Sequence, residues 1–325
     1  MRYYEIVINP IGAGAFEPII YSTLGGFGDN YSALQVDLDI YQTQSHQPSP
    51  LGSINIYGVP FEDLNSSANL VGAFVEVYLG MTPGYDIVTP RIGLAVKGTV
   101  LQSFGNWQGN NVCLSLIITM ANINPANDIN LTFNWKPGQP LDEAVTLTLQ
   151  NAYNGVPVTG NYSPDLVFTE VQSAWFPNLQ SFSEWLNTIS RSINLDPAYL
   201  GATIIPTSTG FNLLDGTTSS EVTLINYTDL IGNITWINQA TISVKVVMRP
   251  DLEVGQYITF PLYAPIVNTT SFSPNRNSVA FQGIFSISQI RHQGSSRQTD
   301  ANSWVTVIEA RIPGQTLLYP TITNF

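Results

Sequence analysis

The chain contains one order of strand-like segments twice, and this duplication limits what it can fold into. In each copy a glycine opens a strand, a second glycine opens another, and a polar turn leads to a closing strand with alternating apolar residues. The first copy occupies residues 72–78, 98–105 and 112–118, and the second occupies residues 255–260, 283–294 and 304–310. The pattern predicts two small β-barrels of related design. Repeats of this kind usually pack quasi-symmetrically instead of forming two separate catalytic sites.

The length and composition fit a β protein of several domains. With 325 residues the chain is long enough for two or three domains, and its hydrophobic content of 44% is ample for packed cores. Only 10% of the residues are charged, well below the usual share of about a quarter. Sparse charge together with many Asn, Ser, Thr, Gly and Tyr is typical of large β assemblies whose surfaces are buried against neighbours. It also fits extracellular β proteins.

The charge balance argues against an open groove that binds nucleic acid. The net charge is −12, from 23 acidic and 11 basic residues. A nucleic-acid groove needs clustered Lys and Arg, and the sequence has no such cluster. The lining of a channel through which DNA must pass without binding favours a negative net charge, because like charges repel. The plainer alternative is that the acidity keeps the protein soluble.

The single cysteine and the chain start exclude several classes of protein. Cys113 is alone, so no disulfide can form within the chain. It lies in the alternating segment 112–118, where we expect it to be a small buried hydrophobe. The start of the chain reads as a strand and not as a signal peptide, and no apolar run approaches the roughly 18 residues of a membrane helix. We therefore expect no membrane insertion, and assembly in a cytoplasm.

Patterning divides the chain into three predicted domains. Residues 1–122 are expected to form the first β-barrel, residues 123–215 a middle α/β domain, and residues 216–325 the second β-barrel. The fold class is therefore mainly β with a small α/β insert. The long polar stretch 268–278 reads as a loop and a contact element.

Individual elements follow from hydrophobic periodicity. Period-two alternation predicts strands at 34–41, 168–175 and 241–248, and a short helical turn is expected at 60–64. Residues 122–140 read as a polar connector. Helices are predicted at 141–153 and 181–193, the second with a capping box formed by Ser181 and Glu184.

No set of residues in the sequence forms a recognisable catalytic motif. Asp37 and Asp39 share one strand face, about 7 Å apart at Cα, which is compatible with glycoside hydrolysis. Two acids on the polar face of a strand are, however, common as solvated or interface carboxylates. Asp251 and Glu253 flank a proline turn, and the same interpretation applies to them.

The remaining functional motifs are also incomplete. The glycines at Gly12 and Gly25 lack the Lys-Ser/Thr ending of a phosphate loop, so they read as strand turns. The two histidines, His46 and His292, lie in different repeat regions and offer no metal-ligand cluster. No Gly-x-Ser-x-Gly elbow accompanies His292, which reads as a structural or interface histidine. We expect no enzyme activity and no cofactor.

The C-terminal segment carries a resemblance to a known family. A Gly-x-Phe-x-Ile strand runs into a His-x-Gly turn, and a Trp-x-Thr strand follows; the matching residues are Gly283, Phe285, Ile287, His292, Gly294, Trp304 and Thr306. This arrangement resembles the last strands of baseplate hub proteins of contractile-tailed bacteriophages. Residues 33–80 resemble the first barrel of that family, and residues 140–182 its middle domain. The sequence stops at Phe325, soon after the second predicted barrel, so we expect a departure from the family in that no lysozyme or spike domain is fused to it.

The resemblance implies an assembly. In such hubs, two barrels per chain from three chains form a pseudo-six-fold ring, which joins a six-fold tail tube to a three-fold central spike. It implies a homotrimer in the virion tail baseplate, in contact with the tail tube protein and the central spike protein. Tape measure and baseplate wedge proteins are further neighbours, and DNA passes without specific binding. Gly283, Phe285, His292, Gly294, Trp304 and Thr306 then become candidates for a subunit interface.

Two alternatives stay open. One is the tail-tip hub of a non-contractile phage, or the hub of a contractile secretion system. The other is a carbohydrate-binding or carbohydrate-hydrolysing β protein, in which some of the six Trp and 15 Tyr would stack on sugars.

Overall fold

The computed structural model describes residues 2–9, 17–25, 28–29, 32–43, 51–82, 91–109, 111–120, 129–196, 199, 201–207, 210–216, 222–238, 240–261, 281, 283–300 and 303–312. The predicted loop at 268–278, the turn at Gly12 and the histidine His46 lie outside these residues. Below, residues 2–120 are called the first unit, residues 129–216 the middle unit and residues 222–312 the second unit.

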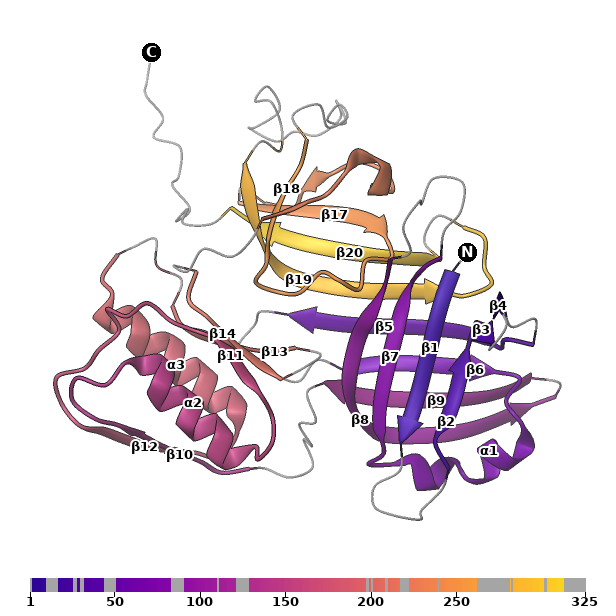
Figure 1. Ribbon diagram of the computed structural model, residues 1–325, viewed down its shortest axis with the longest axis horizontal. Helices are drawn as coiled ribbons and strands as arrows, with labels where there is room; N and C mark the ends of the chain where they lie inside the picture. The colour runs from indigo at the N-terminus through magenta and orange to yellow at the C-terminus, as the bar shows by residue number, and fades with distance from the viewer. Residues whose placement is uncertain are drawn as a thin grey trace.

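The three units lie around a common centre (Figure 1). The first unit occupies the lower right of that view, the middle unit the lower left and the second unit the top. The fold is mostly β with antiparallel sheets and a small α/β insert, as the sequence predicts. The domain boundaries themselves stay predictions.

The first unit is built from strands and two short helices. Its elements are β1 (Arg2–Asn9), β2 (Ile19–Ser22), β3 (Leu24–Gly25), β4 (Gly28–Asp29), β5 (Gln35–Thr43), β6 (Leu51–Tyr57), α1 (Phe61–Asn65), η1 (Ser67–Leu70), β7 (Phe74–Met81), β8 (Arg91–Gln108) and β9 (Asn111–Met120). The short helical turn expected at 60–64 is therefore present as α1.

The middle and second units follow in chain order. The middle unit contains β10 (Leu131–Trp135), α2 (Leu141–Ala152), β11 (Val158–Gly160), β12 (Gln172–Phe176), α3 (Leu179–Ile193), β13 (Thr203–Pro206) and β14 (Phe211–Leu214). The second unit contains β15 (Val222–Leu224), η2 (Tyr227–Asp229), β16 (Thr235–Trp236), β17 (Thr241–Val247), β18 (Tyr257–Thr259), β19 (Ile284–Ser295) and β20 (Trp304–Arg311).

The predicted repeat is present as a repeated strand order. In the first unit neighbouring strands follow the order β5-β6-β9-β8-β7, and in the second unit β16-β17-β20-β19-β18. Every pair within these two series is antiparallel. The copies differ at their far end, where β7 is flanked by antiparallel β1 but β18 by parallel β15.

A β-bulge marks the same place in both copies. The register between β8 and β9 shifts between Val100 and Gln102, and the register between β19 and β20 shifts between Ile287 and Gln289. A bulge adds one residue to one strand and increases its local bend. The two long middle strands are therefore bent at matching points, and Gln102 is the structural equivalent of Gln289.

One continuous sheet joins the two copies. β5 of the first unit pairs antiparallel with β19 of the second, from Thr43 opposite Gln289 to Asp37 opposite Ser295. We call this pairing the seam. The sequence predicts two barrels but gives no indication of the seam, because each strand pattern is complete without its neighbour.

Each unit has its own hydrophobic cluster, and the clusters share residues across unit borders. The first cluster includes Ile6, Ile54 and Val77 and also takes in Met248 and Trp304 from the second unit. The cluster of the second unit takes in Ile205 and Leu214 from the middle unit. The units are therefore packed together and are not tethered only by linkers.

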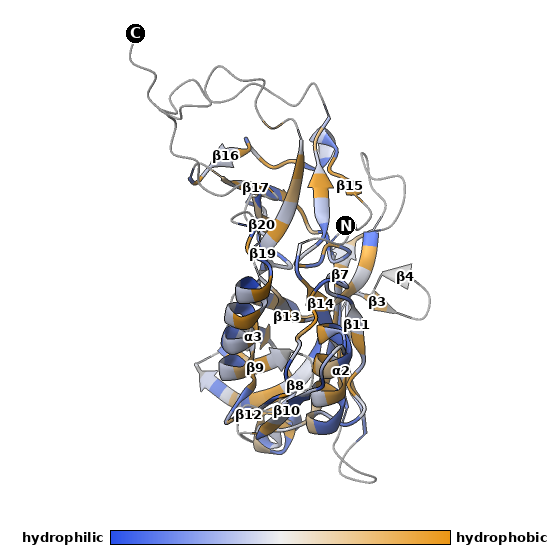
Figure 2. Ribbon diagram, turned by 90° about the vertical axis from the view of Figure 1, so that its left-hand side faces the viewer, coloured by the Kyte–Doolittle hydropathy of each residue, from blue (hydrophilic) through white to orange (hydrophobic). Residues whose placement is uncertain are grey.

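The middle unit follows its predicted helices more closely than its predicted strands. α2 buries Leu141, Ala144, Val145 and Leu149, as the periodicity indicates. Hydrophobic and hydrophilic residues alternate along α3 in Figure 2, and its buried side includes Phe182 and Leu186. The prediction that 122–140 is only a connector is wrong for Leu131–Trp135, which form β10. β10 pairs antiparallel with β12, which begins at Gln172 and not at residue 168 as predicted.

The predicted capping box of α3 is also wrong. The helix begins at Leu179, and the side chain of Asn178 accepts a hydrogen bond of 2.9 Å from the backbone N–H of Ser181. Ser181 is thus the third helical residue instead of the cap. Asn is as good an N-cap as Ser, and the earlier start allows Leu179 to be buried.

Replacing the observed cap should therefore weaken the middle unit. We expect Asn178→Ala to lower the free energy of unfolding by about 1 kcal/mol, because an N–H at the helix start loses its partner. Ser181→Ala keeps that N–H and should change the free energy by less than about 0.5 kcal/mol. Urea unfolding followed by circular dichroism measures both, and a larger loss for Ser181→Ala would contradict the assignment.

Cys113 does not occupy the buried position expected for it. On β9 the inward residues are Leu114, Leu116 and Ile118, whereas Cys113 is half-buried on the other face, with its Sγ 3.7 Å from Ser115 Oγ. The predicted alternation is present in β9, but the prediction that Cys113 is buried is wrong. Among the described helices, none is both long and apolar enough to cross a bilayer.

Candidate functional site at the junction of the two β units

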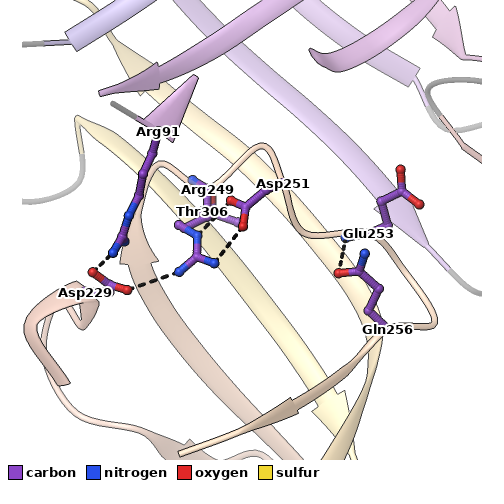
Figure 3. A network of polar contacts seen from close by, with 7 residues as sticks. All are labelled: Arg91, Asp229, Arg249, Asp251, Glu253, Gln256 and Thr306. Atoms are coloured by element: carbon purple, nitrogen blue, oxygen red, sulfur yellow. Dashed lines mark hydrogen bonds and ion pairs between the residues drawn. The ribbon is translucent and has the colours of Figure 1, made fainter. Parts of the chain in front are cut away.

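A network of buried and half-buried charges lies where the first and second units meet (Figure 3). Arg91 is the first residue of β8, Asp229 ends η2, and Arg249 and Asp251 lie in the turn that follows β17. We call these four residues the junction network. Two of its members, Asp229 and Arg249, have side chains that are only 8% exposed.

Arg249 is held by two carboxylates. Its Nε and one terminal nitrogen donate to Asp251 at 2.7 and 2.6 Å, and its other terminal nitrogen donates to Asp229 at 3.1 Å. Burial by itself lowers the pKa of Arg249, but the hydrogen bonds and charge of Asp251, together with those of Asp229, outweigh it and raise the pKa. The guanidinium therefore stays charged, and both carboxylates hold it in one orientation.

The network connects the two units directly. Arg91, from the first unit, donates to the second oxygen of Asp229 at 2.6 Å. Close by, a Cβ added at Gly93 would lie 3.3 Å from the ring of Pro250, so the backbone of β8 passes tightly against the turn. The indole N–H of Trp304 donates to the carbonyl of Gly80 at 2.9 Å, which ties β20 to β7.

His292 and Thr306 lie beneath this junction and are fully buried. The hydroxyl of Thr306 accepts a hydrogen bond of 2.9 Å from the backbone N–H of Arg249 and lies 3.0 Å from Nδ1 of His292. Nε2 of His292 has no hydrogen-bond partner among the described residues. Burial lowers the pKa of His292 to about 4, with a smaller opposing effect from Asp251. The imidazole is therefore neutral at pH 7.

The neutral histidine predicts a pH-dependent stability. Since the pKa of His292 in the folded chain is below its ordinary value of 6.5, the unfolded chain binds a proton first as the pH falls. Neutral His292 contributes fully to the free energy of unfolding above about pH 6.5. As the pH falls from there to about 4, the free energy of unfolding decreases by about 3 kcal/mol. Urea unfolding at pH 7, 5.5 and 4.5 measures this loss.

The matched control is His292→Gln. This variant keeps every carboxylate, so the difference between the two pH profiles isolates the imidazole. We expect a flatter profile between pH 6.5 and 4 in the variant than in the wild type. Equal slopes would show that other groups account for the dependence.

The structure places the six family-signature residues on β19, on β20 and just before β19. Phe285, His292, Trp304 and Thr306 are buried, Gly294 is half-buried, and Gly283 is exposed. Gly294 has φ +149°, and a Cβ there would lie 2.2 Å from the carbonyl oxygen of Ser303. Of the four buried residues, His292, Trp304 and Thr306 lie at or beneath the junction, whereas Phe285 packs in the core of the second unit. Their part in a subunit interface stays a prediction.

The acidic pair considered for glycoside hydrolysis is partly engaged. Asp39 accepts two hydrogen bonds from Arg291 across the seam, at 2.7 and 2.6 Å. Asp37 accepts a hydrogen bond of 3.3 Å from Gln35 on the same strand. The geometry therefore agrees with interface carboxylates, at least for Asp39.

The junction suits holding and positioning better than chemistry. Its carboxylates are paired with arginines, and its histidine is buried away from solvent. Within the part of the chain that the structure describes, no three His, Cys, Asp or Glu side chains are grouped to hold a metal ion. No sequence motif pointed to Arg91, Asp229 or Arg249. The available signal was a rare arginine next to Pro250 in a chain with only 11 basic residues.

Comparison with solved structures identifies proteins with the same fold. A 43 kDa tail protein of prophage MuSo2 from Shewanella oneidensis aligns with a TM-score of 0.55 and 10% identity, covering 96% of this chain and 99% of that one. A tail protein from Neisseria meningitidis aligns with a TM-score of 0.54 and 10% identity, covering 96% and 97%.

A third similar structure comes from a secretion machine. It is an Escherichia coli component of the type VI secretion system, described as structurally similar to T4 bacteriophage tail proteins. It aligns with a TM-score of 0.52 and 9% identity, covering 87% of this chain and 75% of that one. No protein-family model matches the sequence, and no curated protein matches it either. The predicted resemblance to phage tail proteins is confirmed at the level of the fold.

Proposed function

We propose, starting from the fold shared with these tail proteins, that the chain is the central hub of a phage tail baseplate. In this proposal three copies form a ring that joins a six-fold tail tube to a three-fold central spike. The observation that carries it is the repeated order of five strands within one chain. Two similar units in each of three copies provide six nearly equivalent positions, which a six-fold neighbour can contact evenly.

Other features agree with a hub. A net charge of −12 favours a lumen that DNA passes without sticking. The middle unit has no counterpart in the repeat, so it would supply the contacts that follow three-fold symmetry. The junction network fixes the angle between the two units, and a ring closes only if that angle is constant. The proposed role is structural and needs no catalysis.

The proposed neighbours follow from the position of a hub. They are the tail tube protein on one side and the central spike protein on the other, with tape measure and baseplate wedge proteins nearby. The proposed location is the virion tail, after assembly in the host cytoplasm. The middle unit, as the unrepeated part, is the proposed contact for the three-fold spike.

Native mass spectrometry and electron microscopy test the proposal. We expect a species of three times 35.6 kDa, alone or after addition of a central spike protein, and a ring with an open centre in micrographs. Monomers under all conditions, including excess spike protein, would rule the hub out. A glycan array run in parallel tests the carbohydrate-binding alternative.

A hub of a contractile secretion system is the second candidate. It is favoured by the similarity to the type VI secretion component. In this proposal the phage hub and the secretion-system hub form the same kind of ring and differ in the proteins around it. Immunogold labelling of purified phage particles should mark the distal end of the tail in the first case and leave particles unlabelled in the second.

A further inference from the structure

We propose that neighbouring copies of this chain join edge to edge, with β16 of one copy adding to the open edge of β8 in the next. This inference rests on the proposed ring and goes further, because it names the strands and the residue register. It is argued from the seam, which shows within one chain how the two kinds of unit fit together.

The repeat allows each seam residue to be matched with an equivalent residue in the other β unit of the same chain. Counting from the matching bulges, Gln289 corresponds to Gln102, so Arg291 corresponds to Phe104 and His292 to Gly105. The inward directions agree. His292 is fully buried, and Gly105, although exposed, lies on the inner face of the sheet, where a Cβ would be 2.9 Å from Leu64 of α1.

The other side of the seam can be matched in the same way. Ile117 of β9 and Glu309 of β20 are equivalent, because each pairs with the first residue after its bulge. Ser53 lies opposite Ile117, and Ser243 lies opposite Glu309, so these two serines are also equivalent. Asp39 pairs with Ser53, and Thr235 pairs with Ser243, so β16 corresponds to part of β5. Tyr41 of β5 therefore corresponds to the residue after β16, which is Ile237.

The strand edge that forms the seam is occupied in the second unit, and the equivalent edge is open in the first unit of the same chain. On β19 the residues Gln289–Ser295 receive β5. The equivalent part of β8 lies beyond Thr99, where the pairing with β7 ends. For residues 101–107, the described part of the chain contains backbone pairing to β9 on one edge and none on the other.

The complementary edge of β16 is also open. β16 ends the sheet order, and its described pairing is to β17 alone. The N–H of Ile237 donates to the carbonyl of Thr241 at 2.9 Å, toward β17. Since backbone groups alternate in direction along a strand, the N–H and C=O of Trp236 point to the open edge. An unpaired edge is a template for another strand.

Transferring the register of the seam to these two edges gives a specific set of contacts. In the seam, Tyr41 lies opposite Arg291 and Asp39 opposite Gln293. The equivalent pairs between copies are Ile237 with Phe104 and Thr235 with Asn106. Ile237 is 52% exposed and Phe104 is 48% exposed, which is high for residues of this type.

The chemistry of the two interfaces differs in a consistent way. The seam is fastened on its outer face by the ion pair of Arg291 with Asp39. In the proposed interface the equivalents of these two residues are Phe104 and Thr235, so no ion pair forms there, and the apolar pair of Phe104 with Ile237 contributes instead. Apolar cross-strand pairs contribute roughly 0.2–1 kcal/mol each beyond the backbone bonds. Because the two edges differ, the contact is head-to-tail, and such a contact forms a ring where the rotation between copies closes.

Cysteine cross-linking tests the register. The variant Phe104→Cys, Ile237→Cys is prepared in a Cys113→Ser background, which removes the native thiol, and is oxidised with copper phenanthroline. Directly opposite residues on paired strands come within disulfide range. We expect a ladder of covalent dimer and trimer on a non-reducing gel. The control variant, Phe104→Cys with Val171→Cys, places the second cysteine at a position on the middle unit that is more exposed than Ile237, and it should give at least tenfold less trimer.

The outcomes separate this inference from the proposed function. If native mass spectrometry shows a trimer but oxidation yields no more ladder than the control, the strand assignment is wrong and the hub stands. If neither a trimer nor a ladder forms, even with spike protein present, both are wrong. A charge swap gives a second measurement. Phe104→Lys and Ile237→Asp should each abolish the trimer, and the double variant should restore at least half of it.

Discussion

Replacing Arg249 with methionine should destabilise the protein by about 3–5 kcal/mol, because it removes one partner of a buried ion pair. The affected group is Asp229, whose side chain is 8% exposed and which would keep only Arg91 as a partner. Asp251 would lose the two hydrogen bonds that Arg249 donates but is half exposed, so water compensates for part of that loss. The expected result is a fall in the midpoint of urea unfolding at pH 7.

A matched variant on the same protein separates burial from charge. Arg291→Met removes an ion pair with equally short contacts, but its two side chains are 46% and 43% exposed. Exposed ion pairs are worth about 0–1 kcal/mol, because solvent and salt screen them. We therefore expect Arg249→Met to cost several times more than Arg291→Met. Equal losses would show that burial does not raise the contribution of the junction ion pairs above that of an exposed pair.

Replacing Trp304 with alanine should also cost about 3–5 kcal/mol, since it removes a large buried side chain. Trp304 belongs to β20 but packs in the hydrophobic cluster of the first unit and is 3% exposed. The cavity would therefore open between the units instead of within one of them. Besides lower stability, we expect easier proteolysis of the linkers between units.

Two further substitutions make the prediction for Trp304 specific. Trp304→Phe keeps an aromatic ring but leaves the carbonyl of Gly80 without its donor, and should cost about 1–3 kcal/mol. Trp175→Ala removes a tryptophan that is 61% exposed on β12 and should cost less than about 1 kcal/mol. Guanidinium unfolding followed by far-ultraviolet circular dichroism ranks the three. A loss for Trp175→Ala as large as that for Trp304→Ala would contradict this role.

The candidate site was only partly predictable from the sequence. His292, Trp304 and Thr306 were selected through a short family-like pattern, and the structure buries all three at or beneath the junction. Arg91, Asp229 and Arg249 were not selected, because they are 20 or more residues apart and follow no spacing rule. An ion pair of this kind depends on where loops meet in space, and periodicity carries no information about that.

Local patterning determined much of this protein. Alternation fixed which face of β5 and β17 is inward, helical spacing fixed α2, and the recurring glycines marked the repeated strands. These features depend on a residue and its near neighbours, so the sequence alone specifies them. Errors arose where two local signals competed, as with Asn178 and Ser181 at the start of α3.

Only the tertiary structure decided how the repeated parts are joined. The seam between β5 and β19 pairs residues about 250 positions apart in the chain, and the bulges that align the two copies show no signature in composition. A strand edge can accept any partner whose backbone bonds and exposed side chains fit. Which edge is filled within the chain, and which is left for another copy, therefore depends on the packing of whole units.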